Sequence, residues 1–136
     1  MFNLTTKEQA GISDHDWDRY VIKADNATLF HQLRFIGYHP DERFKNISLV
    51  YQKRDKVIAL GIFALVTKEE RTVLTSYPGA SWGGFVYQQP LSYKQANTLC
   101  SLLINLAWKL SYREIQLTLP PAIYNRTPND TLTFCL

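Results

Sequence analysis

A short segment rich in glycine, hydroxyl and aromatic residues carries the side chains best suited to bind a ligand. Gly83 and Gly84 stand side by side in it, just before a strongly patterned helix. A glycine inside an ordinary strand or helix costs about 1 kcal/mol, so a pair of them indicates a bulge or a place where a ligand or another backbone comes close. The candidate substrate-binding residues of this segment and of a later strand end are Ser76, Tyr77, Ser81, Trp82, Gly83, Gly84 and Tyr124.

Two interpretations of this segment are open. In the functional interpretation, the glycine backbone lines a cleft for an extended ligand, Ser76 and Tyr77 supply hydroxyls, and Trp82 forms an aromatic wall. Tyr124 then closes the cleft from the end of the next strand, because ligands of such sheets sit beyond the strand C-termini, where neighbouring connections diverge. In the structural interpretation, the strand is bulged because Trp82 or Phe85 needs room to pack.

The sequence identifies no catalytic residue. Its three histidines lack the spacing of metal ligands, so a structural role is favoured for them and no metal is expected. The chain has no G-x-S-x-G nucleophile elbow, no Walker loop and no G-x-G-x-x-G motif. The histidines are His15, His31 and His39.

The composition is that of a soluble globular protein of one domain, with 136 residues, 46% of them hydrophobic and 20% charged. The net charge of +3 is mildly basic, and the tightest basic cluster, residues 53–56, is typical of a solvated hairpin tip. We therefore expect no DNA binding. The sequence has no signal-like N-terminus, no run of about 18 apolar residues and only two cysteines, Cys100 and Cys135, which predicts a cytoplasmic protein without a membrane span.

Hydrophobic periodicity predicts the elements that position the glycine segment. Ser13 has the residue type of a helix N-cap, and a second helix is expected over residues 27–38. Residues 46–66 have the pattern of a hairpin. Its apolar arm, residues 57–66, predicts a strand that is covered on both faces and lies centrally in a sheet. A third strand begins near Thr72 and leads into the glycine pair.

The clearest predicted element is a helix over residues 92–111, which opens on the serine and glutamine of a capping box. Ile104 and Trp108 widen its apolar stripe, which predicts burial over much of its girth. Residues 114–119 alternate as a last strand, and the C-terminal tail is loop-like. This order predicts a single α/β (α+β) domain over residues 1–136, with a mixed, largely antiparallel sheet and helices on both faces.

The order of several short motifs resembles GNAT superfamily acyltransferases, in particular their Fem-like branch. A Trp-x-x-Tyr-Val helix precedes an Ala-Thr-x-Phe-His segment, and the hairpin carries a Val-Ile-Ala-x-Gly core. A Leu-Thr-Ser segment then leads to the glycine pair, and a helix and a Glu-Ile-Gln-Leu strand follow in the same order as in the family. The resemblance covers residues 14–124, with its motifs at residues 17–21, 27–31, 57–61, 74–76, 83–84 and 114–117.

The resemblance implies a GNAT-like fold and transfer of an acyl or aminoacyl group to an amine. Donors in the family are acyl-coenzyme A or aminoacyl-tRNA. Acceptors in the Fem branch are cell-wall precursors, which implies a role in cell envelope biosynthesis. Members that use coenzyme A hold its pyrophosphate with a glycine-rich loop before the helix. In this chain residues 88–94 stand there without a glycine, and Pro90 lacks the N–H donor.

The chain also ends about where the last helix and final strands of the family begin. The resemblance therefore predicts the acceptor-side half of an acyltransferase, with its C-terminal strands missing and no coenzyme A pyrophosphate loop of its own. It would bind a small-molecule or cell-wall-precursor acceptor, as the N-terminal domain of a longer protein with a second GNAT-like domain.

Two alternatives are open. One is a non-catalytic module whose unpaired sheet edge binds a partner or forms a homodimer. The other is a complete small acetyltransferase with an unusual donor loop.

Overall fold

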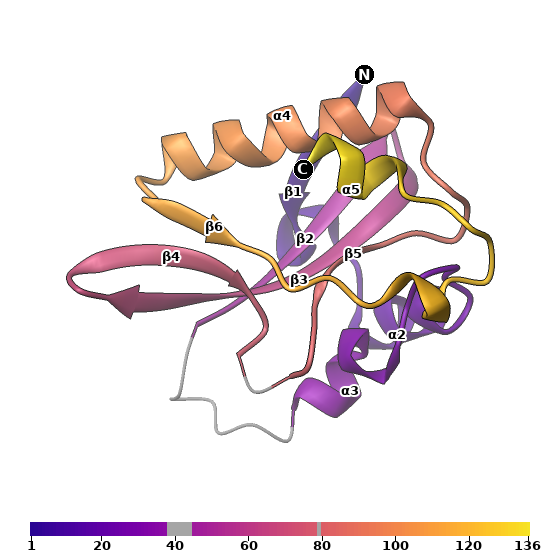
Figure 1. The fold of residues 1–136 in the computed structure, drawn as a ribbon, viewed down its shortest axis with the longest axis horizontal. Helices are drawn as coiled ribbons and strands as arrows, with labels where there is room; N and C mark the ends of the chain where they lie inside the picture. Colours follow the sequence, from indigo (N-terminus) through magenta and orange to yellow (C-terminus); the bar gives the residue numbers. More distant parts are fainter. Residues whose placement is uncertain (38–44, 79) are drawn as a thin grey trace.

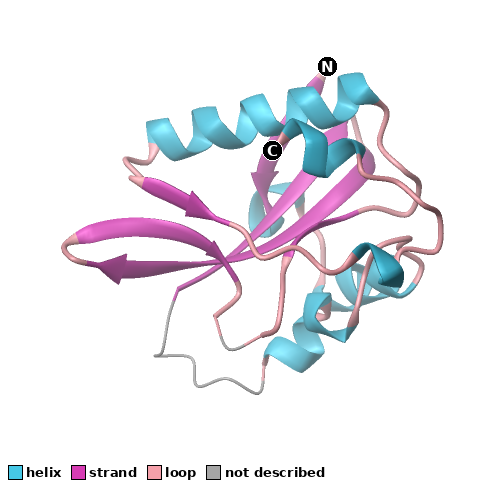
Figure 2. Cartoon of the chain, in the orientation of Figure 1, coloured by secondary structure: helices cyan, strands magenta, loops and turns pink. Residues whose placement is uncertain are grey.

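The computed structural model describes residues 1–37, 45–78 and 80–136, whose strands form one sheet with helices packed against it (Figures 1 and 2). The strands are β1 (Phe2–Thr6), β2 (Lys45–Lys53), β3 (Lys56–Lys68), β4 (Arg71–Ser76), β5 (Gly84–Val86) and β6 (Glu114–Gln116). The helices are α1 (Lys7–Ala10), α2 (Asp14–Ile22), α3 (Leu33–Ile36), α4 (Tyr93–Lys109) and α5 (Thr131–Cys135), with 3₁₀ turns η1 (Leu29–His31) and η2 (Ala122–Tyr124).

The sheet is mixed and mostly antiparallel, as the sequence predicts. Its strand order is β1-β2-β3-β4-β6, and β5 also pairs with β3. The described pairs are antiparallel apart from β4 with β6, which run parallel after the crossover through α4. β6 therefore stands at one edge of the sheet. Within the three described ranges, β4 is the only strand that pairs with it.

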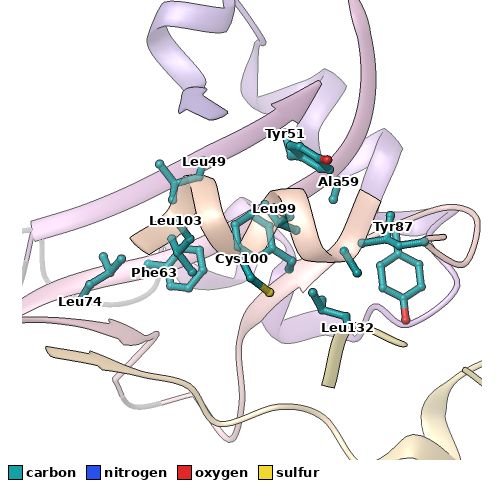
Figure 3. Close-up of a cluster of buried hydrophobic side chains, with 13 residues drawn as sticks. Leu49, Tyr51, Ala59, Phe63, Leu74, Tyr87, Leu99, Cys100, Leu103 and Leu132 are labelled. Carbon is teal, nitrogen blue, oxygen red and sulfur yellow. The ribbon is translucent and has the colours of Figure 1, made fainter. Parts of the chain in front are cut away.

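The middle strand, β3, separates two hydrophobic cores. Leu60 and Ile62 belong to the core that contains Trp17 of α2, whereas Ala59 and Phe63 belong to the core beneath α4. Figure 1 shows α4 and α5 over one face of the sheet and α2 and α3 on the other. Figure 3 shows the core beneath α4. The predictions of a central β3 and of helices on both faces are confirmed.

Helix α4 begins with the predicted capping box. Ser92 Oγ accepts from the Gln95 N–H at 3.2 Å, and Gln95 Oε1 accepts from the Ser92 N–H at 2.9 Å. Leu103 packs in the core, but Ile104 is 51% and Trp108 80% exposed. The prediction that α4 is buried over much of its girth is therefore wrong for these two residues. Their side of the helix lies next to the short edge strand β6, beyond which the described residues place no further strand.

The sequence predicts neither β1 nor α5. β1 is short, with Phe2 and Leu4 as its only alternating apolar residues, and it forms by pairing with β2 over forty residues away in the chain. α5 occupies a tail whose pattern is loop-like, and it is held by Leu132, which is buried against the core beneath α4. Both elements depend on distant partners more than on their own sequence.

The single helix predicted over residues 27–38 is wrong: η1 and α3 stand in its place. The chain turns between them because Asp18 of α2 accepts from the backbone N–H groups of Leu33, at 2.7 Å, and Arg34, at 3.2 Å. The carboxylate thus satisfies free amides at the start of α3. Tyr38 and His39 lie outside the described residues.

Candidate functional site

The strand beside β3 is interrupted at the glycine segment. Phe63 of β3 pairs with Ser76, the last residue of β4, whereas Ile62 pairs with Gly84, the first residue of β5. The chain therefore leaves the sheet after Ser76 and rejoins it at Gly84, opposite two consecutive residues of β3. This excursion is much larger than a one-residue bulge. Position 79 within it lies outside the described residues.

Thr118 forms hydrogen bonds with both ends of this excursion. Its N–H donates to Ser76 Oγ at 2.8 Å, and its carbonyl accepts from the Gly83 N–H at 3.0 Å. Ser76 is buried, so the hydroxyl that the sequence offers as a ligand group already accepts a hydrogen bond from the protein. The chain that follows β6 thus brings Ser76 and Gly83 together.

The two glycines let the protein's own chain come close. A Cβ atom at Gly83 would stand 3.0 Å from the Tyr77 nitrogen and 3.4 Å from the Ile62 oxygen. Gly84 has a φ of +96°, and a Cβ atom there would stand 3.3 Å from Leu119 Cδ2. Protein atoms therefore line the glycine backbone, which favours the structural interpretation of these two positions. Their role in binding a ligand stays a prediction.

The outer edge of β5 is occupied by the side chain of Asn26. Its Nδ2 donates to the Phe85 carbonyl at 3.0 Å, and its Oδ1 accepts from the Tyr87 N–H at 2.9 Å. The Asp25 N–H donates to the Tyr87 carbonyl at 2.7 Å. One side-chain amide thus stands where a neighbouring strand would pair, and an extended ligand on this edge would have to displace residues 25–26.

Trp82 lies between two aromatic rings. Its ring centroid is 5.3 Å from that of Phe30 and 5.3 Å from that of Tyr124. The indole N–H donates to Thr28 Oγ1 at 2.9 Å, which fixes the plane of the ring. Tyr124 is 52% exposed, so the outer side of this aromatic stack is open to solvent.

The other two candidate residues lie in different environments. Tyr77 is buried, and its hydroxyl donates to Asn46 Oδ1 at 2.7 Å. Ser81 is exposed. Among the seven candidates, the structure therefore brings together Ser76 and Tyr77 with Gly83, and Trp82 with Tyr124. It leaves only Ser81 and Tyr124 well exposed to solvent.

Replacing Gly84 with alanine is expected to lower the free energy of unfolding by about 2 kcal/mol, because an L-residue at positive φ is strained and its Cβ would meet Leu119. Urea denaturation measures the loss. Gly37→Ala is the matched control, since Gly37 has a φ of −59° and its nearest neighbouring atom is 3.5 Å from the added Cβ. Equal losses in the two variants would contradict this account of Gly84.

A buried histidine shares Thr28 with Trp82. His31 Nδ1 accepts from the Thr28 N–H at 3.0 Å, so the neutral ring carries its proton on Nε2. Nε2 is buried and has no hydrogen-bond partner among the described residues. Burial lowers the pKa of His31 from 6.5 to about 4, while the backbone of Thr28 and Gly83 acts in the opposite direction. The imidazole is therefore neutral at pH 7, in keeping with a structural role.

A groove between α4 and β6 is the second candidate site, and the sequence analysis missed it. Two adjoining hollows of about 380 and 370 Å³ form this α4–β6 groove and share Ile104 and Ile115 in their walls. Trp108 lines the first hollow, and Leu117 and Leu136 line the second. The available signal was the pair Ile104 and Trp108, two large apolar residues beyond the stripe that one buried helix face requires.

Two further properties concern metals and membranes. Across residues 1–37, 45–78 and 80–136, no group of three or more histidine, cysteine, aspartate or glutamate side chains is placed to hold a metal ion. Nor does any helix in these ranges have the length and apolar character needed to cross a membrane.

Comparisons with known proteins find a likeness in fold. No protein-family model matches the chain, and no curated protein matches it. Among solved structures, TTHA1254 from Thermus thermophilus and a point mutant of it are similar, with TM-scores of 0.54 and 0.55. Each is 14% identical to this chain, and the match covers 98% of this chain and 83% of the other. The likeness is one of fold alone. It supports an α+β architecture with a mixed, mostly antiparallel sheet.

Proposed function

We propose that this chain is a GNAT-like domain that acts as a binding module and forms a homodimer through the β6 edge of its sheet. The order of elements supports the GNAT-like assignment: an antiparallel meander, an interrupted strand made of β4 and β5, a helical crossover and a parallel edge strand. One observation carries the binding role. The outer side of β6 has no strand partner among the described residues and is bordered by the apolar α4–β6 groove.

An unpaired strand edge recruits other chains because its N–H and C=O groups seek partners. Large exposed apolar residues beside the edge add to this tendency: Ile104 and Trp108 line the groove and are 51% and 80% exposed. Tryptophan is among the residues that most often dominate an interface. Two copies related by a two-fold axis would pair β6 with β6 antiparallel and would bury both tryptophans in the same contact.

Sedimentation velocity over a wide range of concentrations tests the homodimer. Trp108→Glu is expected to weaken dimerisation at least about tenfold, because it removes an aromatic anchor and introduces a charge at the interface. Asn105→Glu is the matched control, since Asn105 is exposed on α4 and does not line the groove. A wild-type chain that stays monomeric at the highest concentration, or equal effects of the two variants, would refute the homodimer.

The acceptor-side half of an acyltransferase is the second candidate function. The Trp82–Tyr124 stack beside the strand interruption favours it, because its exposed Tyr124 ring offers an aromatic wall at a strand end, which suits an acceptor substrate. A coenzyme A donor site is less well supported. The loop before α4 surrounds a hollow of only about 150 Å³, and the Gln95 N–H at the helix start is used by the capping box.

Thermal-shift measurements with acyl-coenzyme A, aminoacyl-tRNA and cell-envelope precursors test this second candidate. Binding of an acceptor should raise the melting temperature of the wild-type chain and have much less effect on Tyr124→Ala, whose exposed ring contributes little to the core. No shift with any of these compounds would argue against acyl or aminoacyl transfer. A rise in melting temperature of equal size in the variant would show that the ligand binds away from Tyr124.

A further inference from the structure

Two free thiols line the same hollow. Cys100 lies on α4 and is 8% exposed, and Cys135 lies in the last turn of α5 and is half-buried. Both are in the wall of the second hollow of the α4–β6 groove, about 370 Å³ in volume. Cys135 also packs against the hydrophobic core to which Cys100 belongs. Two cysteines from separate elements thus lie in the wall of one hollow.

The orientation of α5 explains why both cysteines lie in the wall of the same hollow. Leu132 is buried in the core beneath α4, and Cys135 follows it by three residues. Residues three apart lie on the same side of a helix, so the side of α5 that holds Leu132 against α4 also carries Cys135. Figure 3 shows the sulfur of Cys100 on the side of α4 next to Leu132.

The two thiols are also close enough to influence each other's ionisation. Burial raises the pKa of the Cys100 thiol, and the Cys135 thiol is the second cause of that rise. A charge on one sulfur is therefore unfavourable beside a charge on the other. A covalent bond between the sulfurs removes both ionisable groups.

We propose that Cys100 and Cys135 are a redox-active pair that forms an intramolecular disulfide and fastens α5 to α4. The oxidant is a low-molecular-weight disulfide such as oxidised glutathione. The more accessible Cys135 thiolate attacks it and releases one glutathione thiolate, which leaves a mixed disulfide. Cys100 then loses its proton and attacks the sulfur of Cys135, which expels the second glutathione. In total, two protein thiols are oxidised and one glutathione disulfide is reduced to two thiols.

The crosslink would close the end of the second hollow and would hold a helix of five residues at the end of the chain. In the reduced state, packing of Leu132 and Cys135 fixes α5. In the oxidised state, a covalent bond fixes it as well and joins residues 100 and 135 into one loop. This inference rests on the positions of the two thiols and does not depend on the proposed homodimer.

Intact mass and peptide mapping of the full-length chain, equilibrated with glutathione redox buffers, test the proposal. The expected product has lost two hydrogens and contains a peptide pair linked through Cys100 and Cys135. The equilibrium constant for the crosslink, measured against glutathione, should be at least about tenfold larger in the folded chain than in urea, because only the fold holds the sulfurs together. The oxidised chain should also melt several degrees higher than the reduced chain.

Cys100→Ser and Cys135→Ser are the matched controls, and each should accept at most one glutathione without a gain in melting temperature. Two glutathione adducts without a crosslink, or disulfide-linked dimers in place of the internal bond, would overturn the proposal. An equilibrium constant no larger in the folded chain than in urea would overturn it too, since the fold would then contribute nothing. These measurements do not depend on sedimentation, so they test the disulfide even if the chain proves to be a monomer.

Discussion

Replacing Asn26 with alanine is expected to lower the free energy of unfolding by about 3 kcal/mol, because a buried backbone group left without a partner costs about 1–3 kcal/mol. The variant loses the bonds from Nδ2 to the Phe85 carbonyl and from the Tyr87 N–H to Oδ1, and both bonds are buried. Urea denaturation measures the loss. Hydrogen exchange at the Tyr87 amide should also become faster than in the wild-type chain.

Asn97→Ala is the matched control for this prediction. Asn97 is exposed on α4, and the bond it accepts from Ser101 goes to its backbone carbonyl, so alanine there removes no described side-chain contact. We expect its stability to stay within about 0.5 kcal/mol of the wild type. If Asn26→Ala were equally mild, the Asn26 side chain would not hold the edge of β5, and that edge would be available to a ligand.

The parts of the fold that the sequence predicts are those encoded within one element. The apolar run over residues 57–66 predicts a strand covered on both faces, and β3 lies in the middle of the sheet with a core on each side. The serine and glutamine that open α4 predict its first turn, and both capping hydrogen bonds are present. In both cases the signal lies within one element, the apolar run of β3 and the cap residues of α4, so a local pattern is enough to predict it.

The parts that the sequence does not predict depend on contacts between distant residues. The apolar stripe of residues 27–38 fits one helix, but Asp18 bonds to amides fifteen and sixteen residues later and the chain turns instead. Ile104 and Trp108 have the character of core residues, and only the position of β6 at the sheet edge leaves them exposed. Hydrophobicity indicates that a residue is able to be buried, whereas topology decides whether a partner covers it.

In the glycine segment, too, the sequence carries a local signal, whereas the contacts come from distant residues. The glycine pair indicates a place where something approaches the backbone, and a Cβ at Gly83 or Gly84 would stand only 3.0 or 3.3 Å from the nearest protein atom. What approaches cannot be read locally, since Thr118 bonds to Gly83 from 35 residues later in the chain, and Asn26 bonds to the nearby Phe85 and Tyr87 from about 60 residues earlier. A ligand and the protein's own chain leave the same signature in the sequence at such a position.

Lowering the pH from about 6.5 to about 4 is expected to reduce the free energy of unfolding by about 3 kcal/mol through His31 alone. Its folded-state pKa of about 4 lies below the unfolded value of 6.5, chiefly because the ring is buried. The unfolded chain therefore binds more protons over this range, and stability falls as the pH falls. Above pH 6.5 the His31 ring is neutral in both the folded and the unfolded chain, so its full contribution to the free energy of unfolding is present. Below about pH 4 both states are protonated and no further loss follows from this group.

Urea denaturation at a series of pH values, together with NMR titration of the His31 ring, measures this effect. His31→Gln keeps an acceptor for the Thr28 N–H and removes the titration, so its stability should depend less steeply on pH between 4 and 6.5. His15→Gln is the matched control, because it replaces a histidine that is exposed on α2 and leaves His31 in place. Protonation also puts a charge beside the Thr28–Trp82 hydrogen bond, so the fluorescence of Trp82 should change over the same pH range. If the His31 ring titrated near 6.5 in the folded chain, water would reach Nε2. The packing around His31 and the neighbouring Trp82 would then be open to solvent.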